Sequence, residues 1–199
     1  MGWKDIYNKR ISCGSLNEEI HPVFEKFIQE THFFKKYALD IGCGPGKYIR
    51  FLEKNGFKAD GLEVADNTGV KTWKGNIFVD DMFNFDIPKA KYDLILSIAA
   101  LHHGYKENVM YLVERINTSL PDSGWVFITM PDKSCLRNWN SFKCREQVAN
   151  DTYIPLKGPE KGIPHSFYSR KEVEKLLSAL RMLKIDIDEI GRWVIRGKK

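Results

Sequence analysis

The sequence lacks any apolar run long enough to cross a membrane, and it has only four cysteines among 199 residues. A membrane-spanning helix needs about 18 or more apolar residues in succession, so no such helix is predicted. The first residues contain neither the apolar core of a signal peptide nor the features of a transit peptide. The cysteines form no Cys-x-x-Cys pair and no zinc-binding spacing. We therefore expect reduced thiols in a cytoplasmic protein that has no membrane partner.

Internal repeats and low-complexity segments are also absent. Hydrophobic residues make up 43% of the chain and charged residues 29%. Those fractions are typical of a globular protein and exclude a disordered, collagen-like or fibrous chain. A chain of this length can bury a sizeable core, so we predict a single domain over residues 1–199.

The net charge of +5 is unevenly distributed along the chain. Residues 1–132 carry 16 Lys+Arg against 18 Asp+Glu, whereas residues 133–199 carry 15 against 8. A basic C-terminal third is explained by a solvated face, or by a surface that meets an anionic partner. Such a partner would be an acidic small molecule or the phosphates of RNA. Composition leaves both explanations open.

Hydrophobic periodicity predicts strands that alternate with helices. Apolar runs indicate buried strands at 37–41 and 92–98, and further strands are expected at 57–64, 76–79 and 125–130. Helical spacing indicates helices near 16–30, 46–55, 109–120 and 169–180. The first and the last of these helices begin with capping-box sequences, Ser15-Leu16-Asn17-Glu18 and Ser169-Arg170-Lys171-Glu172. Residues 182–190 and 193–195 flank Gly191, which is typical of a hairpin.

This order of elements predicts an α/β fold. We expect a doubly wound, mostly parallel seven-stranded sheet that ends in an antiparallel hairpin. Ligands of open sheets bind beyond the carboxyl ends of the strands. Functional residues are therefore expected in the segments that follow the strands.

Three glycines, Gly42, Gly44 and Gly46, lie between the first predicted strand and the helix after it. Glycine lets the backbone approach a ligand closely, and the helix start offers free N–H groups. The loop is not a P-loop, because Lys47 is followed by Tyr48 rather than by Ser or Thr. It also departs from the dinucleotide pattern GxGxxG, which disfavours an NAD-dependent oxidoreductase.

An acidic residue, Glu63, ends the second predicted strand, 17 residues after Gly46. A carboxylate at this place can accept hydrogen bonds from both hydroxyls of a ribose. By itself, such a residue would be interpreted as a solvated strand end. Together with the glycine loop, it predicts a nucleoside-binding site.

Taken in order, these motifs resemble those of class I S-adenosylmethionine-dependent methyltransferases, and most closely the methyltransferase type 11 group. The similarity spans residues 37–131 and includes the glycine loop, Glu63, Asp81-Met82 and the run from Tyr92 to His103. It implies a Rossmann-like methyltransferase fold and S-adenosyl-L-methionine as the cofactor. It leaves the methyl acceptor unspecified.

The resemblance also implies two groups of cofactor-binding residues. The first group would surround the methionine part and the ribose: Asp40, Gly42, Cys43, Gly44, Glu63, Ser97 and Ile98. The second group would face the adenine: Val64, Asp81 and Met82. Asp81 is assigned here rather than Asp80 because it lies 12 residues before Asp93, the usual spacing in the family.

His102 and His103 follow the fourth predicted strand, where the sulfonium of the cofactor would lie. A catalytic histidine there would take a proton from the acceptor, since the ordinary pKa of the imidazole is near neutrality. The pair occurs in family members with very different acceptors, which is equally consistent with a structural role. Adjacent histidines rarely converge on one ion, so no metal site is predicted.

Two flanking segments are expected near the site. Residues 1–36 are interpreted as an N-terminal helical lid, with Trp3 and Tyr7 closing the cofactor pocket. Residues 132–168 show no regular element and are interpreted as a cover of the acceptor site or as a plain surface excursion. The crossover after Val64 is too short for a helix of the usual length.

A fainter similarity links the chain to tRNA wobble-uridine methyltransferases, through residues 46–48, 97–99, 153–156, 165–168 and 192–195. We favour an enzyme with a small-molecule acceptor, because a tRNA-sized partner usually needs a broader basic surface than +5 provides. The alternatives are a tRNA-modifying methyltransferase and a non-catalytic S-adenosylmethionine-binding partner of another subunit. The oligomeric state is left open.

Overall fold

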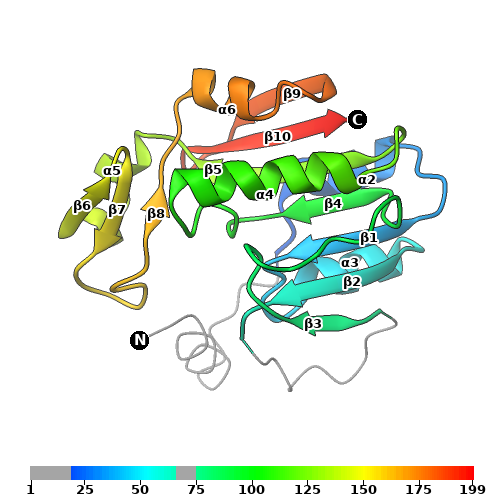
Figure 1. The fold of residues 1–199 in the computed structure, drawn as a ribbon, viewed down its shortest axis with the longest axis horizontal. Coiled ribbons are helices and arrows are strands. Elements are labelled where there is room, and N and C mark those ends of the chain that lie inside the picture. Colours follow the sequence, from blue (N-terminus) through cyan, green and yellow to red (C-terminus); the bar gives the residue numbers. More distant parts are fainter. Residues whose placement is uncertain (1–18, 66–74) are drawn as a thin grey trace.

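The computed structural model describes residues 19–65 and 75–199. The strands of its large sheet are β1 (Tyr37–Ile41), β2 (Lys58–Glu63), β3 (Ile77–Val79), β4 (Leu94–Ser97), β5 (Trp125–Pro131), β9 (Arg181–Ile187) and β10 (Arg192–Lys198). They lie in the order β3-β2-β1-β4-β5-β10-β9 (Figure 1). Strands β1 to β5 are parallel, and β10 runs antiparallel to both of its neighbours. The predicted sheet and its terminal hairpin are confirmed.

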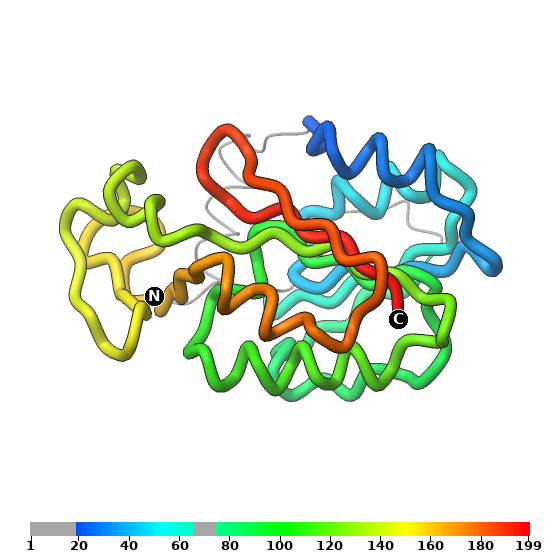
Figure 2. Tube along the Cα trace, turned by 90° about the horizontal axis from the view of Figure 1, so that it is seen from above, coloured from blue at the N-terminus to red at the C-terminus, as the bar shows by residue number. Residues whose placement is uncertain are grey.

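Helices cover both faces of this sheet: α2 (Pro22–Glu30), α3 (Lys47–Lys54), α4 (Lys106–Ser119) and α6 (Arg170–Leu176). Figure 2 shows α2 and α3 on one side of the sheet and α4 and α6 on the other. The predicted capping box of α6 forms, because the Ser169 side chain and the Glu172 side chain each accept from the other residue's backbone N–H. The other predicted capping box lies outside the described residues.

The core consists of two apolar layers, one on each face of the sheet. In β1, Leu39 packs in the layer beneath α4 and α6, and Ala38 packs in the layer beneath α2 and α3. Phe127 of β5 anchors the second layer, with its ring centroid 4.8 Å from that of Phe24 in α2. Successive strand residues alternate between faces. Burial of both faces therefore explains the mostly apolar sequences of β4 and β5.

A buried carboxylate holds the end of the sheet opposite the glycine loop. Asp60 of β2 is fully buried and accepts hydrogen bonds from Lys91 Nζ (2.8 Å), Tyr92 Oη (2.9 Å), Tyr37 Oη (3.1 Å) and the Asn76 backbone N–H (2.9 Å). A buried charge is tolerated only when it is paired and hydrogen-bonded. This carboxylate therefore ties β2 to β1 and to the segments that lead into β3 and β4.

Residues 132–168 contain regular structure, so the prediction of none was wrong. They form α5 (Cys135–Asn138), the 3-10 helix η1 (Asn140–Phe142) and an antiparallel sheet of β6 (Arg145–Ala149), β7 (Thr152–Pro155) and β8 (His165–Ser166). We call this unit the cover segment. Figure 1 places it beyond the carboxyl ends of the parallel strands. Its strands span only two to five residues, too few for a periodic pattern to stand out.

Part of the predicted N-terminal lid belongs to the core, since Phe24, Phe27 and Ile28 of α2 are buried against the sheet. Trp3 and Tyr7 lie outside the described residues, and their closing role stays a prediction. No helix in the described ranges is long and apolar enough to span a membrane.

Candidate active site

The glycine loop follows β1 and is held against β2 by backbone hydrogen bonds. The N–H groups of Gly42 and Cys43 both donate to the Leu62 carbonyl, at 2.8 and 3.1 Å. Gly42 has a φ of 74°, in the left-handed region that favours glycine. A Cβ atom there would lie 2.2 Å from the Cβ of Ala100. Only glycine therefore lets the loop pass this close to the segment that follows β4.

Glu63 ends β2 with its carboxylate turned toward the glycine loop. Its Oε2 accepts from the Gly44 N–H at 2.9 Å, and its Oε1 accepts from the N–H groups of Val64 (2.9 Å) and Ala65 (3.2 Å). Burial raises the pKa of this carboxyl, and the three backbone hydrogen bonds oppose that rise. A carboxylate has about four lone-pair sites, so Glu63 orders the loop and keeps acceptor capacity for a ligand.

Asp40 lies in β1 and is 1% exposed. Its Oδ2 has no hydrogen-bond partner among the described residues. Burial, together with the nearby Glu63 carboxylate, raises the pKa of Asp40 to about 8, and the charge of Lys47 opposes this rise. A buried carboxyl oxygen without a partner is costly in a folded protein. It therefore fits a site where a ligand's cationic group supplies the missing partner.

A cavity opens among the loops that follow β1, β2, β3 and β4. It is lined by Gly42, Leu62, Glu63, Val64, Asp80, Asp81, Met82, Phe83, Ala100 and His103. Six of these were predicted site residues: Gly42, Glu63, Val64, Asp81, Met82 and His103. Of the other four, Asp80 was set aside in favour of Asp81 in the sequence analysis, and Leu62, Phe83 and Ala100 were missed. Phe83 and Leu62 adjoin predicted residues, but nothing in the sequence indicates that Ala100 meets Gly42.

Several predicted residues do not line this cavity. Ser97 is fully buried, and its Oγ donates to the Ile41 carbonyl at 3.0 Å. Ile98 packs against the apolar layer beneath α2 and α3. The Cys43 side chain is buried in that same layer. These side chains thus pack within the protein and support the site. Their contacts with a cofactor stay predictions.

The two predicted histidines lie in different environments. His102 is 3% exposed, and burial, with smaller effects of His165 and Arg192, holds its pKa well below the ordinary value. His103 is half-buried and lines the cavity. Of the two, only His103 is placed to meet a ligand in the cavity.

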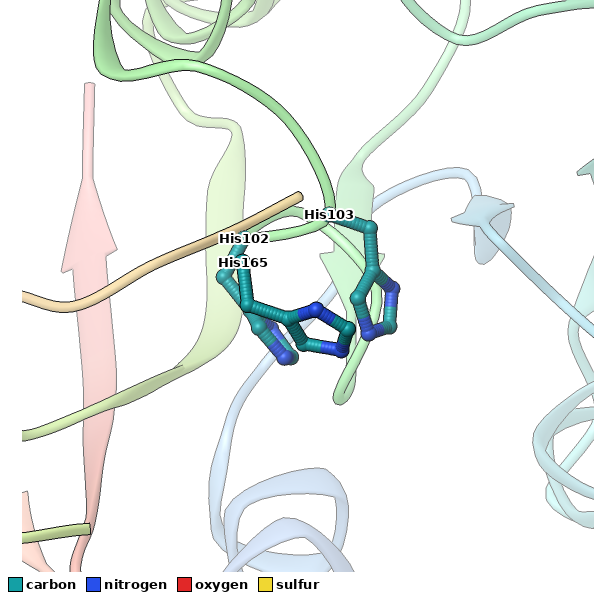
Figure 3. Close-up of side chains that lie close together, drawn as sticks. All are labelled: His102, His103 and His165. Carbon is teal, nitrogen blue, oxygen red and sulfur yellow. The ribbon is translucent and has the colours of Figure 1, made fainter. Parts of the chain in front are cut away.

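A third histidine, His165 of β8, joins the pair (Figure 3). Its ring centroid lies 4.6 Å from that of His103 and 5.6 Å from that of His102. Sequence reasoning did not group it with the pair because 61 residues separate it from His103 and no spacing motif links them. The cover segment therefore contributes a buried side chain that packs against the histidine pair.

Comparison with known proteins gives one similar sequence and several solved structures with a similar fold. Over 87 residues, the chain is 30% identical to the "tRNA (carboxymethyluridine(34)-5-O)-methyltransferase" of Schizosaccharomyces pombe. The matched stretch covers 44% of this chain and 37% of that enzyme. A solved structure from Pyrococcus horikoshii OT3 has a TM-score of 0.73 at 15% identity, covering 98% of this chain and 94% of that one.

A second solved structure carries bound ligands. It is the 1,6-didemethyltoxoflavin-N1-methyltransferase of Burkholderia thailandensis, crystallised with 1,6-didemethyltoxoflavin and S-adenosylhomocysteine. Its TM-score is 0.61 at 15% identity, with 82% of this chain and 70% of that chain covered. At such identities the two structures show a shared fold.

Family membership rests on a longer match. Residues 16–180 match the methyltransferase domain family, which is most of the chain and includes the glycine loop, Glu63 and the histidine pair. The fold, the glycine loop and the orphaned Asp40 carboxyl agree with that match. The chain therefore belongs to the methyltransferase domain family, whose members are enzymes that use S-adenosylmethionine.

Proposed function

We propose that this methyltransferase transfers the methyl group of S-adenosylmethionine to a small acidic acceptor, which enters between the cavity and the cover segment. The observation that supports the proposal most strongly is the cavity itself, where Glu63 at the glycine loop and His103 share one lining. An acidic acceptor agrees with the excess of Lys and Arg in residues 133–199.

The proposed work of the protein is positioning. When bound, the cofactor supplies a methyl group on a positively charged sulfur. Asp40 would pair with its ammonium group, Glu63 would accept from its ribose hydroxyls, and Val64, Met82 and Phe83 would enclose the adenine. Methyl transfer needs alignment and exclusion of water more than acid–base chemistry. His103 is placed to take the proton of a neutral nucleophile.

Transfer of labelled methyl groups tests this proposal. The enzyme is incubated with methyl-tritiated S-adenosylmethionine and either a panel of small carboxylic acids and phenols or bulk tRNA. We expect label in the small-molecule fraction. Label in tRNA alone would contradict the proposal, and cofactor binding without any transfer would favour the non-catalytic alternative.

His103→Asn should lower kcat by about 10²–10⁴-fold while cofactor affinity changes little, because a general base acts on the acceptor's proton. His102→Asn is the matched comparison, since His102 is buried and its imidazole is held neutral. We expect it to lower the melting temperature and to leave turnover per folded molecule nearly unchanged. Equal loss of turnover in both variants would argue against a specific role of His103.

Cofactor binding should release a proton from the protein near pH 7. The Asp40 carboxyl, with its pKa raised to about 8, is mostly protonated there, and a bound ammonium group favours the carboxylate. Affinity should therefore increase from pH 6 to pH 8, by up to about tenfold per unit. Calorimetry in two buffers with different ionisation enthalpies measures the release. Asp40→Asn should abolish the proton release. Equal binding enthalpies of the wild type in the two buffers would contradict the pairing of Asp40 with the ammonium group.

A tRNA acceptor is the second candidate, favoured by the match to the fission yeast enzyme and by the basic C-terminal third. Filter binding of bulk tRNA across a salt series separates the two. Contacts with a single strand give a log–log slope of about −0.7 for each phosphate neutralised. For a small-molecule enzyme we expect weak retention with a shallow slope, and a steep slope would favour tRNA.

A further inference from the structure

Three imidazole rings converge at the edge of the cavity, two from the segment after β4 and one from β8 (Figure 3). One nitrogen from each of His102, His103 and His165 lies within 4.8 Å of the other two. Nitrogens bound to one zinc ion at about 2.1 Å stand about 3.4 Å apart in a tetrahedral site. The nitrogens therefore need to approach one another by at most about 1.4 Å to share an ion.

Both ring nitrogens of His165 lie next to oxygen atoms that only accept hydrogen bonds, an arrangement that favours a cation beside the ring. Nδ1 lies 2.8 Å from the Ile163 carbonyl, which only accepts, so Nδ1 carries the proton. Nε2 lies 3.2 Å from Oε2 of Glu160, and a carboxylate likewise only accepts. A neutral ring would thus point its lone pair at a carboxylate. Either a second ring proton or a metal ion relieves that contact.

His102 favours the metal over the proton. Its Nδ1 is buried and has no hydrogen-bond partner among the described residues. Burial keeps this ring neutral, and a charge on His165 would further oppose its protonation. A bound ion would supply a partner for that unpaired His102 nitrogen.

Hydrogen bonds and an ion pair fix the cover segment to the segment that carries His102 and His103. Ser166, next to His165, donates its N–H to the His102 carbonyl at 2.9 Å and its Oγ–H to the Gly104 carbonyl at 2.6 Å. Lys106, at the start of α4, forms an ion pair with Asp151 of the cover segment at 2.9 Å. A site built on such fixed segments is pre-organised for a ligand.

We propose that His102, His103 and His165 form a site for a divalent first-row transition metal, with zinc as the reference ion. Three neutral imidazoles suit Zn²⁺, Co²⁺, Ni²⁺ and Cu²⁺. The hydrogen bond from Nδ1 of His165 to the Ile163 carbonyl is the outer contact that fixes a ligating tautomer in metal sites. Because His103 lines the cavity, the ion would lie beside the space where an acceptor would enter. It would occupy the His103 lone pair, so the general-base role proposed above belongs to the metal-free protein.

Metal titration without any cofactor or acceptor tests this site, so its outcome is independent of the proposed methyl transfer. The full chain is stripped with a chelator and titrated with Co²⁺ while the visible absorption is recorded, and Zn²⁺ is then added to displace it. We expect one ion per chain and strong bands of low-coordinate Co²⁺. Zn²⁺ at 100 times its Kd should raise the melting temperature by about 5–10 °C.

Variants locate the ion. His103→Ala, at a half-buried position, and His165→Asn, which keeps a donor for the Ile163 carbonyl, should each weaken Zn²⁺ binding by more than about 100-fold. His32→Ala, at an exposed histidine between α2 and β1, should leave the affinity unchanged. If His165→Asn does not fold, the Zn²⁺ affinity of His103→Ala alone shows whether the ion binds at the three histidines.

Two results would overturn the proposal. One is a wild-type protein that takes up no Co²⁺ or Zn²⁺ at neutral pH, which would leave a proton shared between His165 and Glu160 as the cation. The other is binding that survives in His103→Ala and falls in His32→Ala, which would place the ion elsewhere.

Discussion

Glu63→Ala should weaken S-adenosylmethionine binding by about 1.5–3 kcal/mol, or roughly 10- to 150-fold. The variant loses an ionised acceptor for the ribose hydroxyls, and hydrogen bonds to charged groups contribute this much. It also leaves the buried Gly44 N–H without the carboxylate that orders the loop. Calorimetric titration of the folded variant measures the effect.

Two comparisons sharpen that experiment. Glu114→Ala removes an exposed carboxylate of α4 and should bind the cofactor as the wild type does. Circular dichroism shows whether Glu63→Ala retains its fold, since loss of the fold would also abolish binding. Wild-type affinity in a folded Glu63→Ala protein would mean that another group holds the ribose.

Asp60→Ala should destabilise the protein by about 3 kcal/mol, at the lower end for a broken buried ion pair because Lys91 keeps 27% of its side-chain surface exposed. The substitution leaves Lys91, Tyr92 and Tyr37 facing an apolar gap. For a chain of this size, the melting temperature should fall by about 6–12 °C. Asp86→Ala, at an exposed site, should leave it unchanged.

The difference in melting temperature between the wild type and Asp60→Ala should disappear in acid. Burial alone would raise the pKa of Asp60, but the hydrogen bonds from Lys91, the Asn76 backbone and Tyr92 outweigh it and lower the pKa. The stabilisation is therefore present above the ordinary carboxyl pKa of about 3.9 and is lost as pH falls through the lower folded value. Melting curves from pH 7 to pH 2 measure this convergence. A constant gap would contradict it.

Local patterns predicted the parts of the site that lie at strand ends. The apolar run of β1 ends in glycine, and Glu63 closes the next strand, so both had to meet at one edge of a parallel sheet. The His103 position followed in the same way from the end of β4. For β1 and β4, burial on both faces produces the apolar run that marks the strand in the sequence.

The parts that depend on tertiary contacts escaped prediction. Ser97 ends β4 as expected, yet its hydroxyl is used by the Ile41 carbonyl, a partner in a neighbouring strand. His165 meets the histidine pair because the short strand β8 docks on the backbone carbonyls of His102 and Gly104. The acceptors in this docking are backbone carbonyls, which every residue has, so they leave no mark in the sequence.

The place of β10 in the sheet affects how the chain folds while it is being translated. This strand lies between β5 and β9, although it comes last in the chain. At about 5–20 residues per second, roughly 3–13 s separate the translation of Pro131 from that of Lys198. Until then, β5 presents unpaired backbone groups flanked by Val126, Phe127 and Ile128, an edge on which another nascent chain can pair. The soluble yield of this protein should therefore rise when chaperones shield that edge during translation.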